Sequence, residues 1–286
     1  CPPGWVKFCE HYFPDLTDNL SSCKSPHQMQ GAMLKSYLAE KNGVDGKKVH
    51  VTSIMPCTAK KYEISRDEHM KSCGCQDTDV VLTTRELARM IKAAGIDFLS
   101  LPEQPADDLL GAYTGAGTIF GVTGGVMEAA LRTAYCLITK EATPPSIDFK
   151  EVRGMEGVKS ATIKIGDAEV NVAIAHQMGN VEKVLNEVRE DLKNGVKPRY
   201  DFIEVMACRG GCVGGGGQPC LATDEVRAAR TAGLYTDDEK ATLRMSHLNP
   251  EVQALYKDYL GEPGSEKAEE LLHTHYHKRE LYKFTK

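Results

Sequence analysis

The most informative stretch of the chain reads EVMACRGGCVGGGGQP and covers residues 204–219. It begins inside an apolar run, Phe202 to Met206, that predicts a strand, and it continues into two cysteines four residues apart, Cys208 and Cys212. Thiolates at this spacing can turn toward one metal centre, and iron–sulfur clusters are held by such thiolates. The glycines that follow permit positive φ and close backbone approach, so that amides can donate to cluster sulfides. The stretch therefore predicts a metal-binding loop at the end of a strand.

Two other interpretations of this loop fit less well. A phosphate-binding loop needs Gly-Lys-Ser/Thr, whereas Gly217 is followed by glutamine and proline. A zinc site needs a second close pair of ligands, and Cys73-x-Cys75 is too tightly spaced for most zinc sites. The remaining candidates are three histidines, two residues apart in a segment expected to be helical, which would not share a face and are interpreted as solvated: His273, His275 and His277.

The composition describes a globular chain. Of 286 residues, 41% are hydrophobic and 26% are charged, which excludes a disordered protein. No apolar run is long enough to cross a membrane, and a net charge of −5 without a dense basic stretch gives nucleic-acid binding no support. Ten cysteines are too few for a disulfide scaffold, so a reducing compartment with some cysteines on a metal is the better interpretation. The opening CPPGW resembles the middle of a sequence, so we expect a C-terminal portion of a longer chain.

Local patterns predict strands alternating with helices through residue 220, which indicates an α/β fold. We expect a helix capped by Ser25 that runs from Pro26 to Gly43 and a helix over 179–195 with Val181, Val184, Leu185, Val188 and Leu192 inward. The other expected elements are strands at 49–55 and 202–206, helices at 84–94 and 126–139, a hairpin of 161–165 with 169–174, a loop-rich stretch at 96–118, and helical segments near 237–246, 251–260 and 265–276.

A second candidate site reads MPCTAKKYE and covers residues 55–63. It places Cys57 at the end of a predicted strand, where the chain turns and a ligand can be approached. Taken alone, this cysteine is better interpreted as a small buried hydrophobe.

Taken together, three motifs resemble the signatures of the iron-only ([FeFe]) hydrogenase catalytic domain: CPPGW at 1–5, MPCTAKKYE at 55–63 and EVMACRGGCVGGGGQP at 204–219. TGGVMEAALR at 123–132 and EVRG at 151–154 are also similar to that family. The tail from Ser246 to His273 resembles a segment that is a separate small subunit in periplasmic relatives. The resemblance covers nearly the whole chain.

The resemblance implies an H-cluster, which is a [4Fe–4S] cubane joined through one cysteine sulfur to a di-iron unit carrying CO, cyanide and an azadithiolate. Cys57, Cys208 and Cys212 match cubane ligands, and Cys212 matches the one that also touches the di-iron unit. Lys60 matches a lysine that hydrogen-bonds a cyanide, which suits a charge-assisted bond.

Further positions match the family's pocket and proton path. Met55, Met206 and Gly125 match residues that line the di-iron pocket. Ser21 matches a proton-relay serine, and Glu63 matches the acid that closes the second motif.

The first motif departs from the family pattern of two adjacent cysteines before Pro-Gly-Trp, one a relay thiol and the next a cubane ligand. Here the pair is Cys1-Pro2. Strict alignment makes Cys1 the relay thiol, and a slip of one residue makes it the cubane ligand. We favour the slip, because a missing ligand costs a cubane more than a changed relay.

The resemblance implies a two-lobed α/β catalytic domain over residues 1–222, N-terminally truncated, with the cluster between the lobes, and a helical small-subunit-like segment over 223–286. The expected activity is the reversible reduction of protons to hydrogen in an anaerobic, cytoplasmic setting, as a ferredoxin- or NAD(P)-linked oxidoreductase. Expected partners are ferredoxin or upstream iron–sulfur domains or subunits, and H-cluster maturation proteins, with neither nucleic acid nor membrane. The alternatives are a hydrogen-sensing hydrogenase of low turnover and a non-enzymatic iron–sulfur assembly factor of related fold, whose lack of a di-iron unit would leave Met55, Lys60 and Gly125 without a role.

Overall fold

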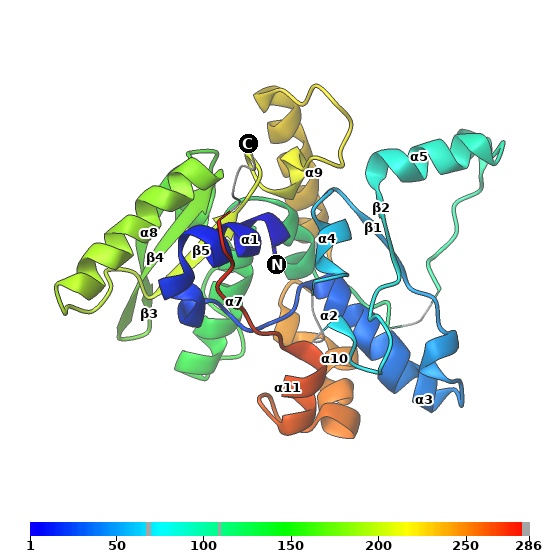
Figure 1. Ribbon diagram of the computed structural model, residues 1–286, viewed down its shortest axis with the longest axis horizontal. Helices are drawn as coiled ribbons and strands as arrows, with labels where there is room; N and C mark the ends of the chain where they lie inside the picture. Colours follow the sequence, from blue (N-terminus) through cyan, green and yellow to red (C-terminus); the bar gives the residue numbers. More distant parts are fainter. Residues whose placement is uncertain (67–69, 108–109, 282–286) are drawn as a thin grey trace. The chain divides into compact units, whose positions relative to one another are not determined.

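A computed structural model describes residues 1–66, 70–107 and 110–281, which fall into two compact units. Unit 1 comprises Cys1–Gly111, Gly217–Pro219 and Ala254–Lys286, and unit 2 comprises Ala112–Gly216 and Cys220–Gln253. Both units combine strands with helices, so the predicted α/β class is confirmed (Figure 1).

Unit 1 contains one parallel pair of strands, β1 (Thr52–Met55) and β2 (Val80–Thr83), in which Thr52 pairs with Val80. Its helices are α1 (Pro3–Tyr12), α2 (Pro26–Met33), α3 (Ala39–Lys41), α4 (Lys60–Glu63), α5 (Thr84–Ala93) and α11 (Glu266–Leu272). Apolar side chains of α2 pack against residues from the C-terminal part of the chain, among them Leu260, Leu271 and Leu272. The end of the chain is therefore part of this unit's core.

The first predicted helix exists, with Pro26 at its first position as expected, but it is not uniform. The chain from α2 to α3 passes through a π-helical turn at Leu34–Leu38. Ser25 is the N-cap residue by position, yet its side chain makes no capping bond and its hydroxyl is buried. The prediction that Ser25 caps this helix through its side chain was therefore wrong.

The helix predicted at 84–94 is confirmed as α5, and its start is fixed by a reciprocal cap. The Thr83 amide donates to Glu86 at 2.8 Å, and the Glu86 amide donates to the Thr83 hydroxyl at 3.2 Å. Gly95 follows the helix with φ of +69°, as the C-terminal glycine prediction required. No residue of α5 is buried, and Met90 is 53% exposed, so this helix contributes no side chain to the core.

Unit 2 contains a three-stranded sheet in the order β3 (Val158–Ile165), β4 (Ala168–His176), β5 (Phe202–Met206). The predicted hairpin is confirmed, with β3 and β4 antiparallel around Gly166, whose φ of +59° the two-residue turn requires. The strand predicted at 202–206 is confirmed as β5, which leads toward Cys208, and the structure shows that it joins β4 in parallel. The helices of the unit are α6 (Gly115–Thr118), α7 (Gly125–Thr139), α8 (Met178–Lys193) and α9 (Asp224–Lys240).

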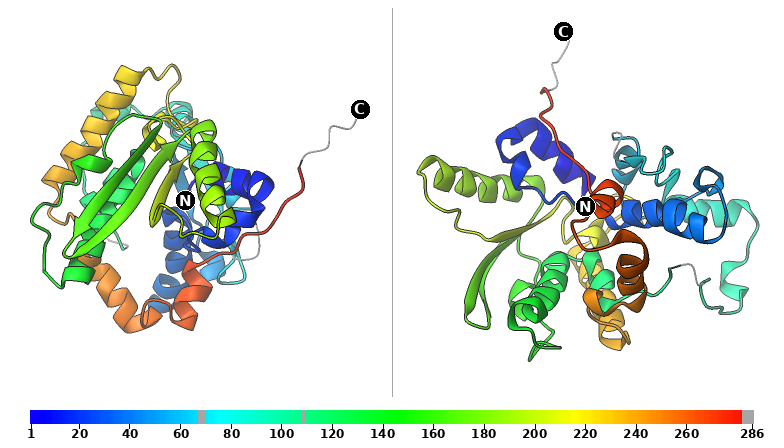
Figure 2. Two further views of the ribbon diagram at one scale, coloured as in Figure 1. Left: turned by 90° about the vertical axis from the view of Figure 1, so that its left-hand side faces the viewer. Right: turned by 90° about the horizontal axis from the view of Figure 1, so that it is seen from below.

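Helices α7 and α8 cover opposite faces of this sheet (Figure 2). Val172 and Ile174 of β4 pack with Met127 and Leu131 of α7, which confirms the predicted helix over 126–139. Because strand side chains alternate, Ala173 and Ala175 face the other way, and both are fully buried. The sheet is therefore sandwiched between two helical layers.

The predicted inward face of α8 is correct except at its end. Val181, Val184, Leu185 and Val188 are buried, but Leu192 is 45% exposed. The last turn is held by ionic contacts, since Asp191 accepts from the Arg199 amide and guanidinium at 2.8–2.9 Å. In this turn Asp191, which is paired with Arg199, is buried in place of the predicted Leu192.

The C-terminal segment is helical, as predicted, but two of its boundaries differ. The helix expected near 237–246 overlaps only the end of α9, which runs from Asp224 to Lys240, and residues 241–245 are not helical. The helix expected over 265–276 is α11, which ends at Leu272, so His273, His275 and His277 lie outside it. The segment near 251–260 is α10 (Pro250–Leu255), continued by a π-helical turn over Tyr256–Leu260. Within the described residues, no helix combines the length and apolar character needed to cross a bilayer.

Candidate metal-binding site

The ten cysteines all lie in the described part of the chain, and none of them forms a disulfide. Cys57, Cys208 and Cys212 are half-buried, and Cys1 is exposed. In the structure, Cys57 and Cys1 belong to unit 1, and Cys208 and Cys212 belong to unit 2.

Cys57 follows β1 directly, and its backbone is covered by the end of the third motif. The amide of Gly217 donates to the carbonyl of Pro56 at 2.8 Å. A Cβ atom added to Gly217 would lie 2.9 Å from the amide nitrogen of Cys57, so only glycine fits this contact. Within unit 1, the end of the third motif is thus hydrogen-bonded to the residue that precedes Cys57.

Lys60 is buried at the start of α4, and its ammonium is fixed by two acceptors. It donates to the carbonyl oxygen of Cys1 at 2.8 Å and to Oε2 of Glu63 at 2.9 Å. An ammonium has three N–H donors. Among the described residues two of these donors have protein partners, so the third can bond a ligand.

Glu63 also bonds to His27, a buried residue that sequence reasoning missed. Nε2 of His27 lies 2.6 Å from the same Oε2 that Lys60 contacts. Burial would raise the pKa of Glu63, but the hydrogen bond from His27 and the charge of Lys60 outweigh burial and lower it to about 2. The group is therefore an ionised carboxylate held between an ammonium and an imidazole.

Nothing local identified His27, because it pairs with a residue 36 positions away. The one available signal was its place as the second residue of a helix that begins after the predicted relay serine. Burial lowers the pKa of His27, and the bond to Glu63 only partly opposes that effect. Nδ1 of the ring is buried and has no partner among the described residues.

Ser21, the predicted relay serine, is an exposed residue in unit 1. Its hydroxyl oxygen accepts from the amide of Cys23 at 3.4 Å, and its carbonyl accepts from the hydroxyl of Tyr276 at 2.6 Å. The structure therefore ties this segment to the C-terminal tail. Among the described residues, Ser21 makes no hydrogen bond with Lys60, Glu63 or Cys1.

The Cys208–Cys212 loop in unit 2 is shaped by glycine. Gly210 and Gly211 have φ of +74° and +93°. The carbonyl of Gly210 accepts from the amide of Thr123 at 3.1 Å, and a Cβ atom on Gly211 would lie 2.7 Å from the same amide nitrogen. The cysteine loop therefore packs directly on the turn that precedes α7.

Gly125 and Met206 lie beside this loop in the same unit. Met206 is the last residue of β5 and is buried. A Cβ atom on Gly125 would lie 1.7 Å from the carbonyl oxygen of Ile119, so a side chain cannot be accommodated. Met55, the other predicted pocket methionine, is half-buried at the end of β1 in unit 1.

The donor set suits a cluster better than a single ion. Among residues 1–66, 70–107 and 110–281, no three His, Cys, Asp or Glu side chains converge as a mononuclear site requires. A cubane instead binds each thiolate at a separate iron. Cys57, Cys208 and Cys212 supply thiolates of this kind, and in unit 1 the buried, unpartnered Nδ1 of His27 can bond a polar group.

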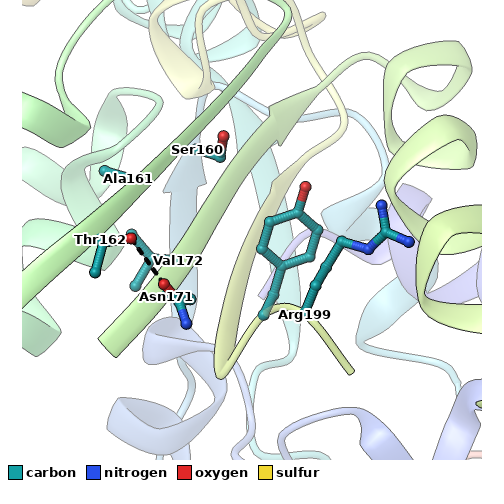
Figure 3. Close-up of a pocket in the computed structure, with 7 residues that line it drawn as sticks. Ser160, Ala161, Thr162, Asn171, Val172 and Arg199 are labelled. Atoms are coloured by element: carbon teal, nitrogen blue, oxygen red, sulfur yellow. Dashed lines mark hydrogen bonds between the residues drawn. The ribbon is translucent and has the colours of Figure 1, made fainter. Parts of the chain in front are cut away.

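A surface hollow on the three-stranded sheet lies apart from these motifs. It is lined by residues of β3, β4 and the turn before β5, including Ser160, Asn171 and Arg199 (Figure 3). The Thr162 hydroxyl and the Asn171 amide oxygen hydrogen-bond across it at 2.7 Å. None of the predicted site residues lines it.

Comparisons with known proteins agree with the motif geometry. Residues 1–216 match a family model described as "Iron only hydrogenase large subunit, C-terminal domain", and residues 224–279 match "Iron hydrogenase small subunit". The chain is 51% identical over 281 residues to the NADP-reducing hydrogenase subunit HndD of Solidesulfovibrio fructosivorans. The aligned region covers 98% of this chain and 47% of that protein. The chain spans about half the length of the hydrogenase relatives that it matches.

A solved structure and a more distant relative complete the comparison. The [FeFe]-hydrogenase HydA1 from Chlamydomonas reinhardtii matches with a TM-score of 0.81 at 42% identity, covering 98% of this chain and 76% of that one. A probable cytosolic Fe-S cluster assembly factor from Drosophila virilis is 31% identical over 287 residues, covering 96% of this chain and 58% of that protein.

Proposed function

The chain belongs to the iron-only hydrogenase family, and on this premise we propose that it forms the catalytic part of an enzyme that reversibly reduces protons to hydrogen. We assign residues 1–222 to the catalytic domain and 223–286 to the small-subunit-like segment. Lys60 carries the proposal, because it is a buried ammonium with one donor left for an anionic ligand. A protein that held only cubanes would gain nothing from this costly arrangement.

The chain's own thiolates would hold the cofactor. Cys57, Cys208 and Cys212 are the proposed cubane ligands, with Cys212 also serving the di-iron unit. Cys1 is the proposed fourth ligand, and the alternative is that Cys1 is the relay thiol. When bound, the H-cluster supplies the redox chemistry that joins two protons and two electrons into hydrogen.

Other residues would shape the pocket and the proton supply. The third donor of Lys60 would bond a cyanide, with Glu63 and the Cys1 carbonyl fixing its direction. Met55 and Met206 would exclude water, and the absence of a side chain at Gly125 would leave room. The hydroxyl of Ser21 would carry protons toward the site.

Electrons would come from ferredoxin or from iron–sulfur domains or subunits, since the relative HndD is an NADP-reducing hydrogenase subunit. Proteins that build the di-iron unit would be needed for activity. The proposed setting is an anaerobic cytoplasm.

A second candidate is supported by the relationship to a cytosolic Fe-S cluster assembly factor. Such a protein would hold cubanes and no di-iron unit, and it would have no use for the Lys60 ammonium. A third candidate is a hydrogen sensor of low turnover, which would hold the cluster without a relay thiol and with which the pair Cys1-Pro2 is compatible.

The test is infrared spectroscopy and hydrogen assay on the full-length protein after loading with the di-iron unit. The hydrogenase proposal expects bands from bound CO and cyanide together with hydrogen evolution from a reduced donor. Cubane spectra without those bands would contradict it and favour the assembly factor. Bands with slow turnover would favour the sensor.

A further inference from the structure

The cluster formed by His27, Glu63 and Lys60 contains one titratable group for which the proposed function gives no role. His27 is buried, with a ring only 4% exposed, yet it is neither a proposed ligand nor part of the proposed relay. Its ring hydrogen-bonds to Glu63 and feels the charge of Lys60, and both residues belong to the second motif. A buried imidazole at a site that handles protons requires an explanation.

The charge on Glu63 determines the tautomer of the ring. An ionised carboxylate has no proton to give, so the 2.6 Å contact requires that Nε2 of His27 carries the hydrogen and donates it. In the neutral imidazole the other nitrogen, Nδ1, is then a basic lone pair. The carboxylate thus fixes the ring as it does in catalytic His–carboxylate pairs, where the nitrogen that faces away from the acid is the working base.

The environment of Nδ1 points to an exchangeable partner. This atom is shielded from solvent and has no partner among the described residues. A buried acceptor that stays unbonded destabilises the folded state. A water, a proton or a donor group on the bound cofactor would remove that cost, whereas an apolar neighbour would not.

We propose that His27 is a proton-accepting residue of this site, with Nδ1 taking up and releasing the proton and Glu63 holding the ring in the required tautomer. In the forward step a water-borne proton bonds to Nδ1, the ring becomes an imidazolium, and Nε2 keeps its hydrogen on Glu63. In the return step the same N–H bond breaks and the proton leaves from Nδ1. No electrons are exchanged, and the inference rests on the proposed hydrogenase function.

The surrounding charges favour rapid release. The charged side chains that face His27 are Glu63 and Lys60, both on α4. Burial and the charge of Lys60 oppose the imidazolium, Glu63 stabilises it, and the balance leaves the pKa of His27 below its usual value. A proton on Nδ1 is therefore held briefly, as a transfer step needs.

The test compares His27→Gln with His50→Gln in the full-length, loaded protein. Glutamine keeps an N–H that can reach Glu63 but has no basic second nitrogen. His50 is a matched control because it also lies in unit 1 near a carboxylate, 3.8 Å from Asp79, but its side chain is 66% exposed. We expect equal iron content and unchanged CO and cyanide bands in both variants. Hydrogen turnover should fall by about 10²-fold in His27→Gln, with a changed pH profile, and both should stay normal in His50→Gln.

A second measurement does not depend on activity. Nitrogen NMR of ring-labelled histidine should show the Nε2–H tautomer for His27 in the native chain, and Glu63→Gln should abolish that preference. Normal turnover and pH profile in His27→Gln, or an Nδ1–H tautomer in the native chain, would overturn the inference. Absence of CO and cyanide bands in the native protein would instead overturn the proposed hydrogenase function, so the two failures are distinguishable.

Discussion

Three cysteines of this chain combine half-buried positions with close glycine contacts, and we expect them to be the ones that bind iron. Cys57→Ser, Cys208→Ser and Cys212→Ser should each lose most of the cubane and all hydrogen turnover, because thiolate is the side chain that holds such clusters. Iron and sulfide assays on the full-length variants measure this.

The control for that series is Cys75→Ser, because Cys75 is also half-buried and also in unit 1 but lies outside the motifs. It should keep full cluster content, as should Cys9→Ser, Cys73→Ser, Cys136→Ser and Cys220→Ser. A full cubane in Cys208→Ser would remove the basis of the ligand assignment.

Lys60 gives a second prediction at the scale of one residue. Lys60→Met keeps much of the side-chain length and removes the ammonium. A charge-assisted hydrogen bond contributes about 1.5–3 kcal/mol, so retention of the di-iron unit should weaken by roughly 10- to 100-fold while the cubane still assembles. Infrared and electron paramagnetic resonance spectra of one sample measure both parts. Normal CO and cyanide bands in Lys60→Met would mean that Lys60 serves only to pair with Glu63.

At the scale of elements, the start of α7 depends on a carboxylate from another element. Glu204 of β5 accepts from the amide of Gly124 at 2.6 Å and from the amide of Met127 at 2.7 Å. Burial raises the pKa of Glu204 to about 7, although these backbone bonds oppose the rise. One side chain therefore joins the strand that leads to Cys208 with the helix that begins at Gly125.

This arrangement makes stability fall as pH rises. The folded state of Glu204 keeps its proton up to about pH 7, whereas the unfolded chain loses it near the ordinary value of 4.5. Between these values the folded state binds more protons, so the free energy of unfolding decreases from about pH 4.5 to 7 and is level above that. Glu204→Gln should remove this decrease. Denaturant unfolding of both proteins at pH 5, 6, 7 and 8 measures it, and parallel stability curves would contradict the raised pKa.

At the scale of the molecule, the segment from 223 onward supplies parts of both units. In unit 2, Arg132 of α7 is fully buried and contacts Glu128 and, through both terminal nitrogens, Asp238 of α9, all at 2.8 Å. In unit 1, Leu260, Leu271 and Leu272 lie in the core with residues of α2. Losing the segment would leave a buried charge short of a partner in one unit and an open core in the other.

We therefore expect that residues 1–222 expressed alone will not fold cooperatively. Removing one partner of a buried ion pair costs about 3–5 kcal/mol, which is a large part of the stability of an ordinary domain. Co-expression of residues 223–286 should restore cooperative unfolding, as measured by circular dichroism against denaturant and by co-purification. A cooperative transition of 1–222 alone at the full-length midpoint would contradict this.

The sequence by itself determined the α/β class, the motif residues and most element types. Each rests on short-range signals, such as the alternation of β3 and β4 around Gly166, the apolar run of β5, and the glycines after Cys208. Local signals failed where a distant contact outweighed them. Leu192 is exposed, and the neighbouring Asp191 pairs with Arg199 instead. The short strand β2 was not predicted, because a run of four residues is a weak local signal and the strand forms by pairing with β1.

Only the tertiary structure decided which polar side chains pair with one another across long stretches of sequence. The bond of His27 to Glu63 spans 36 residues, the cap of Glu204 on α7 spans about 80, and the pairing of Arg132 with Asp238 spans 106. No periodicity or spacing encodes such pairs, because each forms only when folding has brought two elements together and removed water from the charges between them. Local propensity specifies where helices and strands form, and the pairing of buried polar groups specifies which of these elements contact one another.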